Sequence, residues 1–143
     1  MALQEVYRQV ILDHYRNPRH RQPLSDADAS SEGANPLCGD EVKVQLQLRE
    51  GRVNAISVTG KGCSISQSSA SLMGEAVSGH PISEVLGLSD RFQGLMQVPP
   101  DSSENGYADL GDLIALAGVR RYPVRIKCAT LPWITLEQAL ENS

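Results

Sequence analysis

A strand–turn–strand pattern in the first half of the chain constrains its fold more than any other feature. Apolar and polar residues alternate from 41 to 49, which is the period of a β-strand with one buried face. Glu50 and Gly51 then predict a tight turn, followed by a returning strand over residues 52–59. The apolar positions of the second strand change parity, so we expect either a bulge near Asn54 or a longer, three-residue loop.

The predicted hairpin brings two cysteines to its open end. Residues that face each other across an antiparallel hairpin have position numbers with a constant sum, which is 101 or 102 for a turn at Glu50 and Gly51. The positions of Cys38 and Cys63 add to 101, so the two cysteines are expected to face each other. Because neighbouring strands lie roughly 4.8 Å apart, the two sulfurs could share one metal ion. Asp40 projects from the same end, so a carboxylate joins the two thiols.

Two cysteines each stand just before a predicted helix. Unpaired amides and the positive end of the helix dipole favour a thiolate at such a position, so we expect Cys63 and Cys128 to ionise more easily. Gly60 and Gly62 flank Lys61, which allows the backbone to approach a bound atom and adds positive potential. A phosphate cradle is the rival interpretation, but this segment lacks the spacing of nucleotide-binding loops.

The three cysteines also permit a simpler interpretation. Cytosolic cysteines are often small buried hydrophobic residues, and spacing alone does not decide between that role and a metal or thiol site. The polar, glycine-flanked surroundings of Cys38 and Cys63 favour a site. Asp40 taken alone is typical of a turn or cap residue.

Helical spacing of apolar residues surrounds the hairpin. Residues 3–14 predict an amphipathic helix that ends at Asn17 and Pro18, and residues 19–34 predict a loop with one short edge strand. Further helices are expected over residues 64–78, 81–96 (one helix or two), 109–117 and 131–141. Residues 120–127 are expected to form a basic link, and Pro132 to lie in the first turn of the last helix.

These elements predict an α+β fold. We expect a single domain spanning residues 1–143, in which a small antiparallel sheet of about three strands packs against several helices. The metal or thiol site would lie at the open end of the hairpin.

The composition argues against two classes of function. The chain has 143 residues, 41% hydrophobic and 21% charged, and no apolar run approaches the roughly 20 residues of a membrane span. The formal net charge of -4 disfavours a surface that tracks nucleic-acid phosphates. The first residues lack the pattern of a secretory signal, so we expect a cytoplasmic protein.

Three cysteine segments carry a specific resemblance. They read Asn-Pro-Leu-Cys-Gly-Asp at 35–40, Gly-Lys-Gly-Cys-Ser-Ile-Ser at 60–66, and Pro-Val-Arg-Ile-Lys-Cys-Ala-Thr-Leu at 123–131. Together with Asp-His-Tyr-Arg-Asn-Pro-Arg at 13–19, they resemble the iron-sulfur cluster assembly proteins of the IscU and SufU type. The resemblance covers nearly the whole chain.

Within that family the sequence is more similar to the SufU branch. Lys127 precedes the third cysteine, where IscU scaffolds have a histidine able to bind metal. The SufU branch also carries extra residues before that cysteine, which the resemblance places around 101–119. Residues 121–125 depart from the double-proline motif by which chaperones recognise IscU scaffolds.

The resemblance implies a zinc site and a reaction. Its ligands would be Cys38, Asp40, Cys63 and Cys128, and the protein would accept persulfide sulfur from a pyridoxal-phosphate-dependent cysteine desulfurase for iron-sulfur cluster biogenesis. Cys38 is the expected sulfur acceptor, which gives the protein a sulfurtransferase-like role. Downstream iron-sulfur assembly proteins would be further partners.

Basic residues near the cysteines would support this site. Three thiolates and one carboxylate give the zinc complex an excess of negative charge, which Lys61, Arg125 and Lys127 could offset or use to dock a partner. Two alternatives stay open: a scaffold that assembles and transfers a transient [2Fe-2S] cluster, and a structural zinc module that only mediates an interaction.

Overall fold

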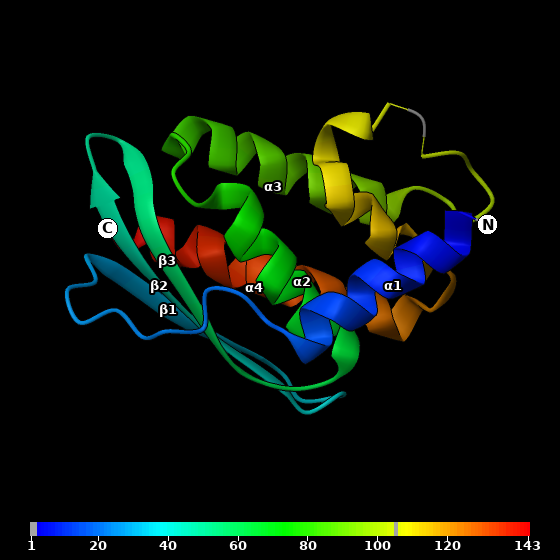
Figure 1. The fold of residues 1–143 in the computed structure, drawn as a ribbon, viewed down its shortest axis with the longest axis horizontal. Coiled ribbons are helices and arrows are strands. Elements are labelled where there is room, and N and C mark those ends of the chain that lie inside the picture. Colours follow the sequence, from blue (N-terminus) through cyan, green and yellow to red (C-terminus); the bar gives the residue numbers. More distant parts are fainter. Residues whose placement is uncertain (1–2, 105) are drawn as a thin grey trace.

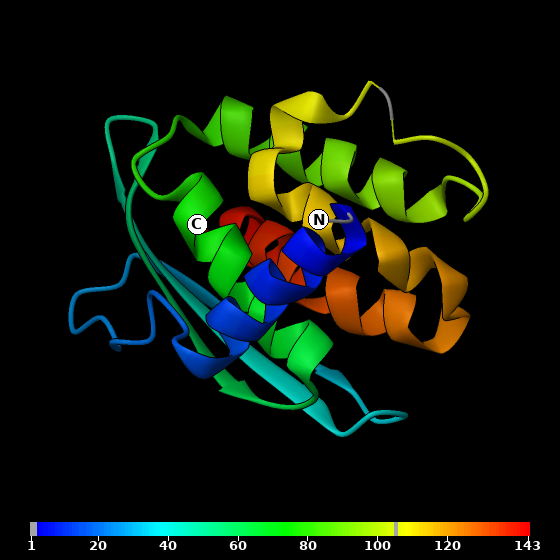
Figure 2. The ribbon, with the colours of Figure 1, turned by 45° about the vertical axis from the view of Figure 1, so that its right-hand side comes forward.

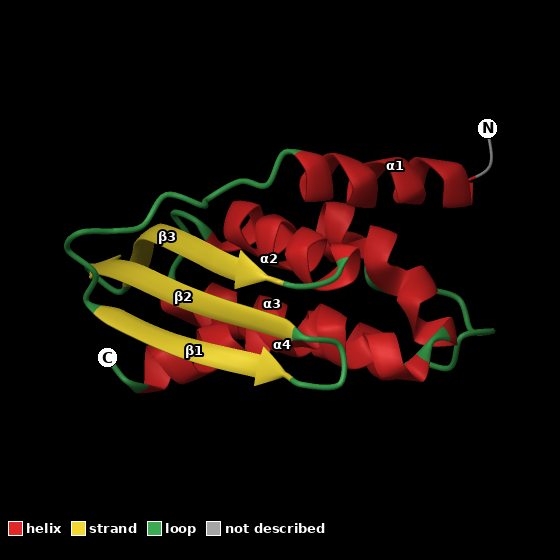
Figure 3. Ribbon diagram, turned by 90° about the horizontal axis from the view of Figure 1, so that it is seen from below, coloured by secondary structure: helices red, strands yellow, loops and turns green. Residues whose placement is uncertain are grey.

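The computed structural model describes residues 3–104 and 106–143, which form one antiparallel sheet and a set of helices (Figure 1). In chain order the elements are α1 (Leu3–Arg16), β1 (Ala29–Asn35), β2 (Asp40–Arg49), β3 (Arg52–Lys61), α2 (Ser64–Val77), α3 (Ile82–Gln97), the 3₁₀ segment η1 (Ala108–Arg121) and α4 (Pro123–Glu141). The strand order is β1-β2-β3. The helices cover one face of this sheet (Figure 3), so the predicted α+β class is confirmed.

The hairpin forms as the alternation predicts. β2 and β3 are antiparallel, from Glu41 facing Lys61 to Arg49 facing Arg52. The register shifts beside Gln47, which faces Ala55 while the next residue faces Val53, so Asn54 has no facing residue. This confirms the bulge alternative. β1 is the expected edge strand.

The core lies between the sheet and the central helices α2 and α4. Val44 and Leu46 on the inner face of β2 are fully buried, as is Trp133 of α4. The Trp133 ring stacks on Phe92 of α3 with 5.2 Å between the ring centroids. Because α4 contacts β1, β2, α2, α3 and η1, it anchors both the sheet and the outer helices.

The last helix begins earlier in the chain than the sequence predicts. Residues 120–127 are not a link, because η1 continues to Arg121 and α4 begins at Pro123. Pro123 fits the first helical turn, where its missing amide costs no hydrogen bond. Pro132 lies inside the helix instead, where it lacks the amide that would donate to the carbonyl of Cys128. Cys128 therefore sits within α4, not ahead of it.

Other expected helices form with small differences. α2 matches the predicted segment 64–78, and residues 81–96 form the single helix α3. The 109–117 segment forms as part of the longer η1, which is broken by non-helical backbone at Gly111 rather than ended by Gly118. Within the described residues, no helix combines the length and apolar character that a membrane crossing needs.

A buried histidine joins α1 to α2. His14 is only 6% exposed, and its Nδ1 lies 2.7 Å from the hydroxyl oxygen of Ser71. Figure 2 shows α1 running across the helices that it contacts. Burial lowers the pKa of His14, the nearby Arg19 guanidinium lowers it further, and neighbouring carboxylates oppose the shift without reversing it.

This histidine predicts a loss of stability in mild acid. The native pKa of His14 lies below the unfolded value of 6.5, so its contribution is complete above that pH and is lost as pH falls toward the native pKa. We expect the urea midpoint to drop between about pH 7.5 and 5.5, and the drop to be smaller in His14→Gln, whose side chain does not titrate. The exposed His80→Gln serves as control. Equal drops in wild type and His14→Gln would contradict the prediction.

Candidate metal centre

Three potential metal ligands meet at one end of the sheet. One ligand atom each from Cys38, Asp40 and Cys128 lies within 4.8 Å of the other two. Cys38 lies in the turn between β1 and β2, Asp40 begins β2, and Cys128 belongs to α4. The β1–β2 turn and α4, which lie far apart in the sequence, therefore supply one compact group of two thiols and a carboxylate.

The Asp40 carboxylate is buried, and only one of its two oxygens has hydrogen-bond partners among the described residues. It is 1% exposed, and its Oδ1 accepts hydrogen bonds from the Cys63 amide (2.9 Å) and the Ser66 hydroxyl (3.1 Å). Its Oδ2 has no hydrogen-bond partner among the described residues. A buried anionic oxygen without a partner is costly unless a cation compensates it, so this oxygen fits a metal ligand.

Cys63 lies beside this group but outside it. It occupies the N-cap position of α2, as the sequence predicts, and its half-buried thiol lies 3.9 Å from the Ser66 hydroxyl. Its amide holds Asp40, so Cys63 is tied to the group through its backbone. All three cysteines are free thiols and no disulfide competes for their sulfurs.

The close packing of these groups shifts the pKa values of Asp40 and Cys128. Burial raises the pKa of the Asp40 carboxyl, but the neighbouring Cys128 thiol and the donors from Cys63 and Ser66 outweigh it, so the pKa falls below its ordinary value. Burial raises the pKa of the Cys128 thiol strongly, and the nearby Asp40 carboxylate and Cys38 and Cys63 sulfurs raise it further. A thiolate at Cys128 therefore needs a cation beside it.

The expected easy ionisation of Cys128 is thus wrong. The prediction placed this cysteine at a helix N-terminus, whereas the structure buries it within α4 among groups that disfavour negative charge. Its side chain is 0% exposed, which also rules out direct access from solvent.

One of the three expected supporting cations interacts with the cysteines. The nearby Cys63 thiol, and to a smaller extent the Cys38 and Cys128 sulfurs, raise the pKa of the Arg125 guanidinium. Lys61 is paired with Glu41 at 3.1 Å and points into solvent. Lys127 is exposed on α4, at a groove between that helix and β1.

Two polar residues of the site were not predicted. The buried Asn35 places its amide nitrogen 3.6 Å from the Cys128 sulfur, and Ser66 supports Asp40 as described above. Both lie inside the cysteine segments that carry the family resemblance. Their position within those segments was the available signal.

Gly62 is required by the close approach of Asp40. A Cβ at this position would overlap Oδ1 of Asp40 and the hydroxyl of Ser66, and its φ of +154° is one that other residues rarely adopt. Gly60 similarly lies against the backbone of Glu41. The two glycines therefore let the end of β3 pack against the start of β2, which holds the carboxylate in place.

Taken together, these residues define a buried cysteine–carboxylate centre at one end of a three-stranded α+β fold. The model of the NifU-like N-terminal domain family matches residues 6–129 of the chain. This match covers most of the sequence, so the protein belongs to the NifU-like N-terminal domain family.

Curated relatives agree with the resemblance found in the cysteine segments. The zinc-dependent sulfurtransferase SufU of Bacillus subtilis is 42% identical over 138 residues, which cover 96% of this chain and 91% of the relative. The iron-sulfur cluster assembly scaffold protein IscU of Streptococcus pyogenes is 36% identical over 141 residues, covering 99% of this chain and 86% of the relative. The expected IscU/SufU resemblance is therefore confirmed.

Solved structures share the fold. A crystal structure from Fervidobacterium islandicum, described as a scaffold protein of the SUF system, superposes with a TM-score of 0.84 at 30% identity and covers 97% of this chain and 99% of its own. A crystal structure of a hypothetical protein gives a TM-score of 0.86 at 34% identity, with the same coverage.

The close packing at Gly62 predicts that a single methyl group disturbs the centre. We expect Gly62→Ala to lower the free energy of unfolding by about 1–3 kcal/mol, because the backbone is strained and the new Cβ pushes Asp40 from its position. Its metal content after purification should also fall. The control is Gly118→Ala, since a Cβ there meets nothing within 4 Å. Equal melting temperatures and metal contents for both variants would refute the packing argument.

Proposed function

We propose that this protein is a zinc-dependent sulfur acceptor that takes persulfide sulfur from a cysteine desulfurase and passes it on for iron-sulfur cluster biogenesis. The observation that carries the proposal is the buried group of Cys38, Asp40 and Cys128 with its unpartnered carboxylate oxygen. The name of the Bacillus subtilis relative supports both the zinc and the sulfur transfer.

The proposed zinc ligands are Cys38, Asp40, Cys63 and Cys128. Three thiolates and one carboxylate suit zinc, which accepts sulfur and oxygen donors and usually takes four ligands in protein sites. When bound, zinc would hold the thiols ionised at neutral pH without changing oxidation state. Arg125 beside Cys63 offsets part of the negative charge.

We assign the acceptor role to Cys38. Its thiol is half-buried in the β1–β2 turn next to Leu37, which is 73% exposed, whereas Cys128 is fully buried. Cys63 is fixed at the start of α2, where its amide donates a hydrogen bond to Asp40. A large partner can therefore reach Cys38 with the least rearrangement.

The transfer is a thiol exchange. The Cys38 thiolate attacks the terminal sulfur of the desulfurase persulfide; a sulfur–sulfur bond forms on Cys38 while that of the persulfide breaks. The desulfurase cysteine leaves as a thiolate, and the proton on the transferred sulfur travels with it. No external oxidant or reductant is needed.

The proposed partners follow from this reaction. A pyridoxal-phosphate-dependent cysteine desulfurase supplies the sulfur, and downstream iron-sulfur assembly proteins receive it. The exposed cations Lys61, Arg125 and Lys127 stand within three residues of Cys63 or Cys128 in the sequence and are the proposed docking residues. Free thiols suit a reducing compartment, so we place the protein in the cytoplasm.

We also propose that residues 1–143 form one domain and that residues 101–119 are the insertion typical of the SufU branch.

The role of Cys38 predicts a sharp difference among the cysteine variants. With labelled cysteine and a desulfurase, Cys38→Ser should carry no covalent sulfur on the acceptor. Cys128→Ser should still accept some label while losing zinc, because it changes a buried ligand and not the acceptor. Uptake of label by Cys38→Ser at the wild-type rate would disprove the assignment.

Asp40 gives a second prediction. If it only caps a turn, Asp40→Ala should cost about 1 kcal/mol and leave zinc in place. As a ligand, its loss should leave the protein folded but alter zinc retention and impair sulfur transfer. Asp40→Asn is the matched variant, since its amide oxygen can still accept from the Cys63 amide while the charge is gone. Unchanged zinc affinity and full transfer in both variants would remove Asp40 from the site.

A [2Fe-2S] scaffold is the second candidate function, favoured by the name of the Streptococcus pyogenes relative. Against it, Lys127 supplies no imidazole, and a carboxylate is a harder ligand than cluster iron prefers.

We expect protein purified without oxygen to be colourless with one zinc per chain. Brown protein containing iron and sulfide would favour the scaffold. Stable binding of a desulfurase without sulfur uptake would instead favour a structural zinc module.

A further inference from the structure

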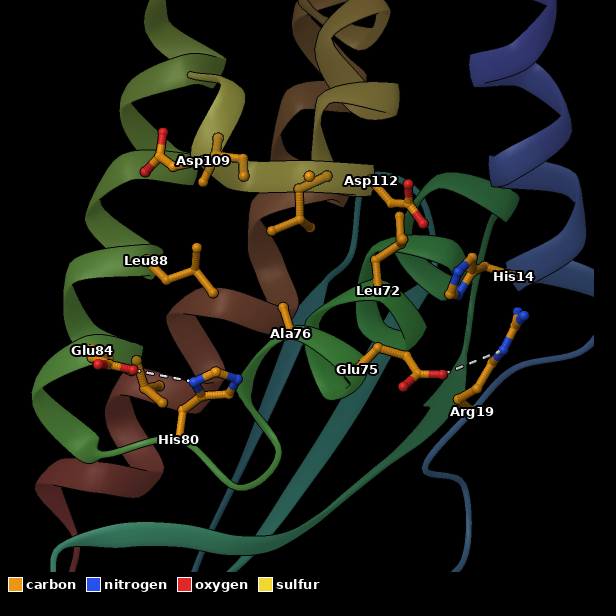
Figure 4. A pocket seen from close by; sticks show the side chains of 14 residues that line it. His14, Arg19, Leu72, Glu75, Ala76, His80, Glu84, Leu88, Asp109 and Asp112 are labelled. Atoms are coloured by element: carbon orange, nitrogen blue, oxygen red, sulfur yellow. Dashed lines mark hydrogen bonds and ion pairs between the residues drawn. The ribbon is translucent and has the colours of Figure 1, made fainter. Parts of the chain in front are cut away.

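A groove on the helical side of the molecule is not used by the metal centre. A cavity of about 600 Å³ opens between α1, α2, α3 and η1 (Figure 4). A second cavity of about 510 Å³ shares Glu84, Leu88 and Asp109 with the first and extends along α3 to Arg91 and Tyr107. The two neighbouring cavities are together called the α3 groove.

The floor of the α3 groove is apolar. Leu72 and Ala76 come from α2, and Leu88 comes from α3, as Figure 4 shows. Val85, Leu110 and Leu113 complete the apolar lining and are buried in the core. Such a floor offers a place for an aliphatic side chain rather than for a fully hydrated ion.

The rim of the α3 groove is acidic. Its carboxylates belong to Glu75, Glu84, Asp90, Asp109 and Asp112. The rim holds only two guanidinium groups, which leaves an excess of three negative charges if the histidines are neutral.

Both of these guanidinium groups are already engaged. Arg19 pairs with Asp13 at 2.8 Å and with Glu75 at 3.7 Å. Arg91 pairs with Asp109 at 2.6 Å and also lies over the Tyr107 ring. In the described part of the chain, Asp90 and Asp112 have no ion-pair partner. The unneutralised charge on the rim is complementary to a positively charged ligand.

The α3 groove is well separated from the metal centre. Cys63 precedes α2, and Leu72 lies nine residues further along the helix. At 1.5 Å per residue this places the groove floor roughly 13 Å down the helix axis from the centre. A partner seated in the groove would leave Cys38 free to meet another protein.

We propose that the α3 groove docks a basic amphipathic segment of a second partner protein, with an aliphatic side chain on the Leu72–Ala76–Leu88 floor and lysine or arginine side chains on the rim. The apolar floor accounts for the choice of a peptide over a free cation, and the excess of carboxylates accounts for its positive charge. This interaction goes beyond sulfur acceptance and does not depend on it.

The test uses the zinc-loaded full chain and a short fluorescent amphipathic peptide of leucine and lysine at physiological ionic strength. We expect saturable binding that is about tenfold weaker in Glu84→Gln/Asp112→Asn. The matched control, Glu50→Gln/Glu141→Gln, removes the same charge from exposed positions outside the groove and should bind like wild type. Ala76→Phe, which fills the floor without changing charge, should also weaken binding. Zinc content and sulfur uptake should stay unchanged in all these variants.

Several outcomes would overturn the proposal. Equal losses in the groove and control variants would mean that the peptide senses only overall charge. Full binding by Ala76→Phe, or complete displacement of the peptide by spermidine, would mean that a free cation suffices. Self-association of wild type that disappears in Glu84→Gln/Asp112→Asn would assign the groove to a second copy of this chain.

Discussion

The hydrogen bond from the Cys63 amide to the Asp40 carboxylate is the contact on which the rest of the centre depends. It joins the first residue of β2 to the start of α2 across the open end of the hairpin. Burying this carboxylate is costly, and the amide and the Ser66 hydroxyl compensate only one of its oxygens. The other oxygen has no hydrogen-bond partner among the described residues, and the carboxylate lies close to the Cys38 and Cys128 sulfurs. The same residue that closes the hairpin therefore also favours a bound cation.

Helices α2 and α4 connect the metal centre to the rest of the fold, and α2 also connects it to the α3 groove. α4 packs Trp133 against Phe92 of α3 and, five residues earlier in the helix, carries Cys128 into the centre. α2 begins at the centre and ends beside the α3 groove, and His14 fastens α1 to its middle through Ser71. Sulfur chemistry and the proposed peptide docking can therefore proceed on a common rigid support without competing for the same surface.

The hairpin and its bulge could be predicted because strand alternation is a local signal with a fixed period. The same pattern placed Cys63 at the end of the hairpin where Asp40 lies, and its amide bonds to Asp40, but the thiol that joins Cys38 and Asp40 in the compact group belongs to Cys128. The site at Cys128 could not be derived in the same way. Pro123 and Pro132 both favour helix starts, and only packing of the whole α4 against the sheet decides which of them begins the helix. The local pattern gave Ser66 and Asn35 no role at the site, since their partners lie 26 and 93 positions away in the sequence.

We propose that three cysteines and Asp40 hold one zinc ion. X-ray absorption at the zinc edge tests it directly, because sulfur and oxygen ligands differ in distance, at about 2.3 Å and about 2.0–2.2 Å. We predict a first shell of three sulfurs and one oxygen in the purified protein, with the oxygen contribution altered in Asp40→Ala. A shell with fewer than three sulfurs, or one unaffected by Asp40→Ala, would contradict the account.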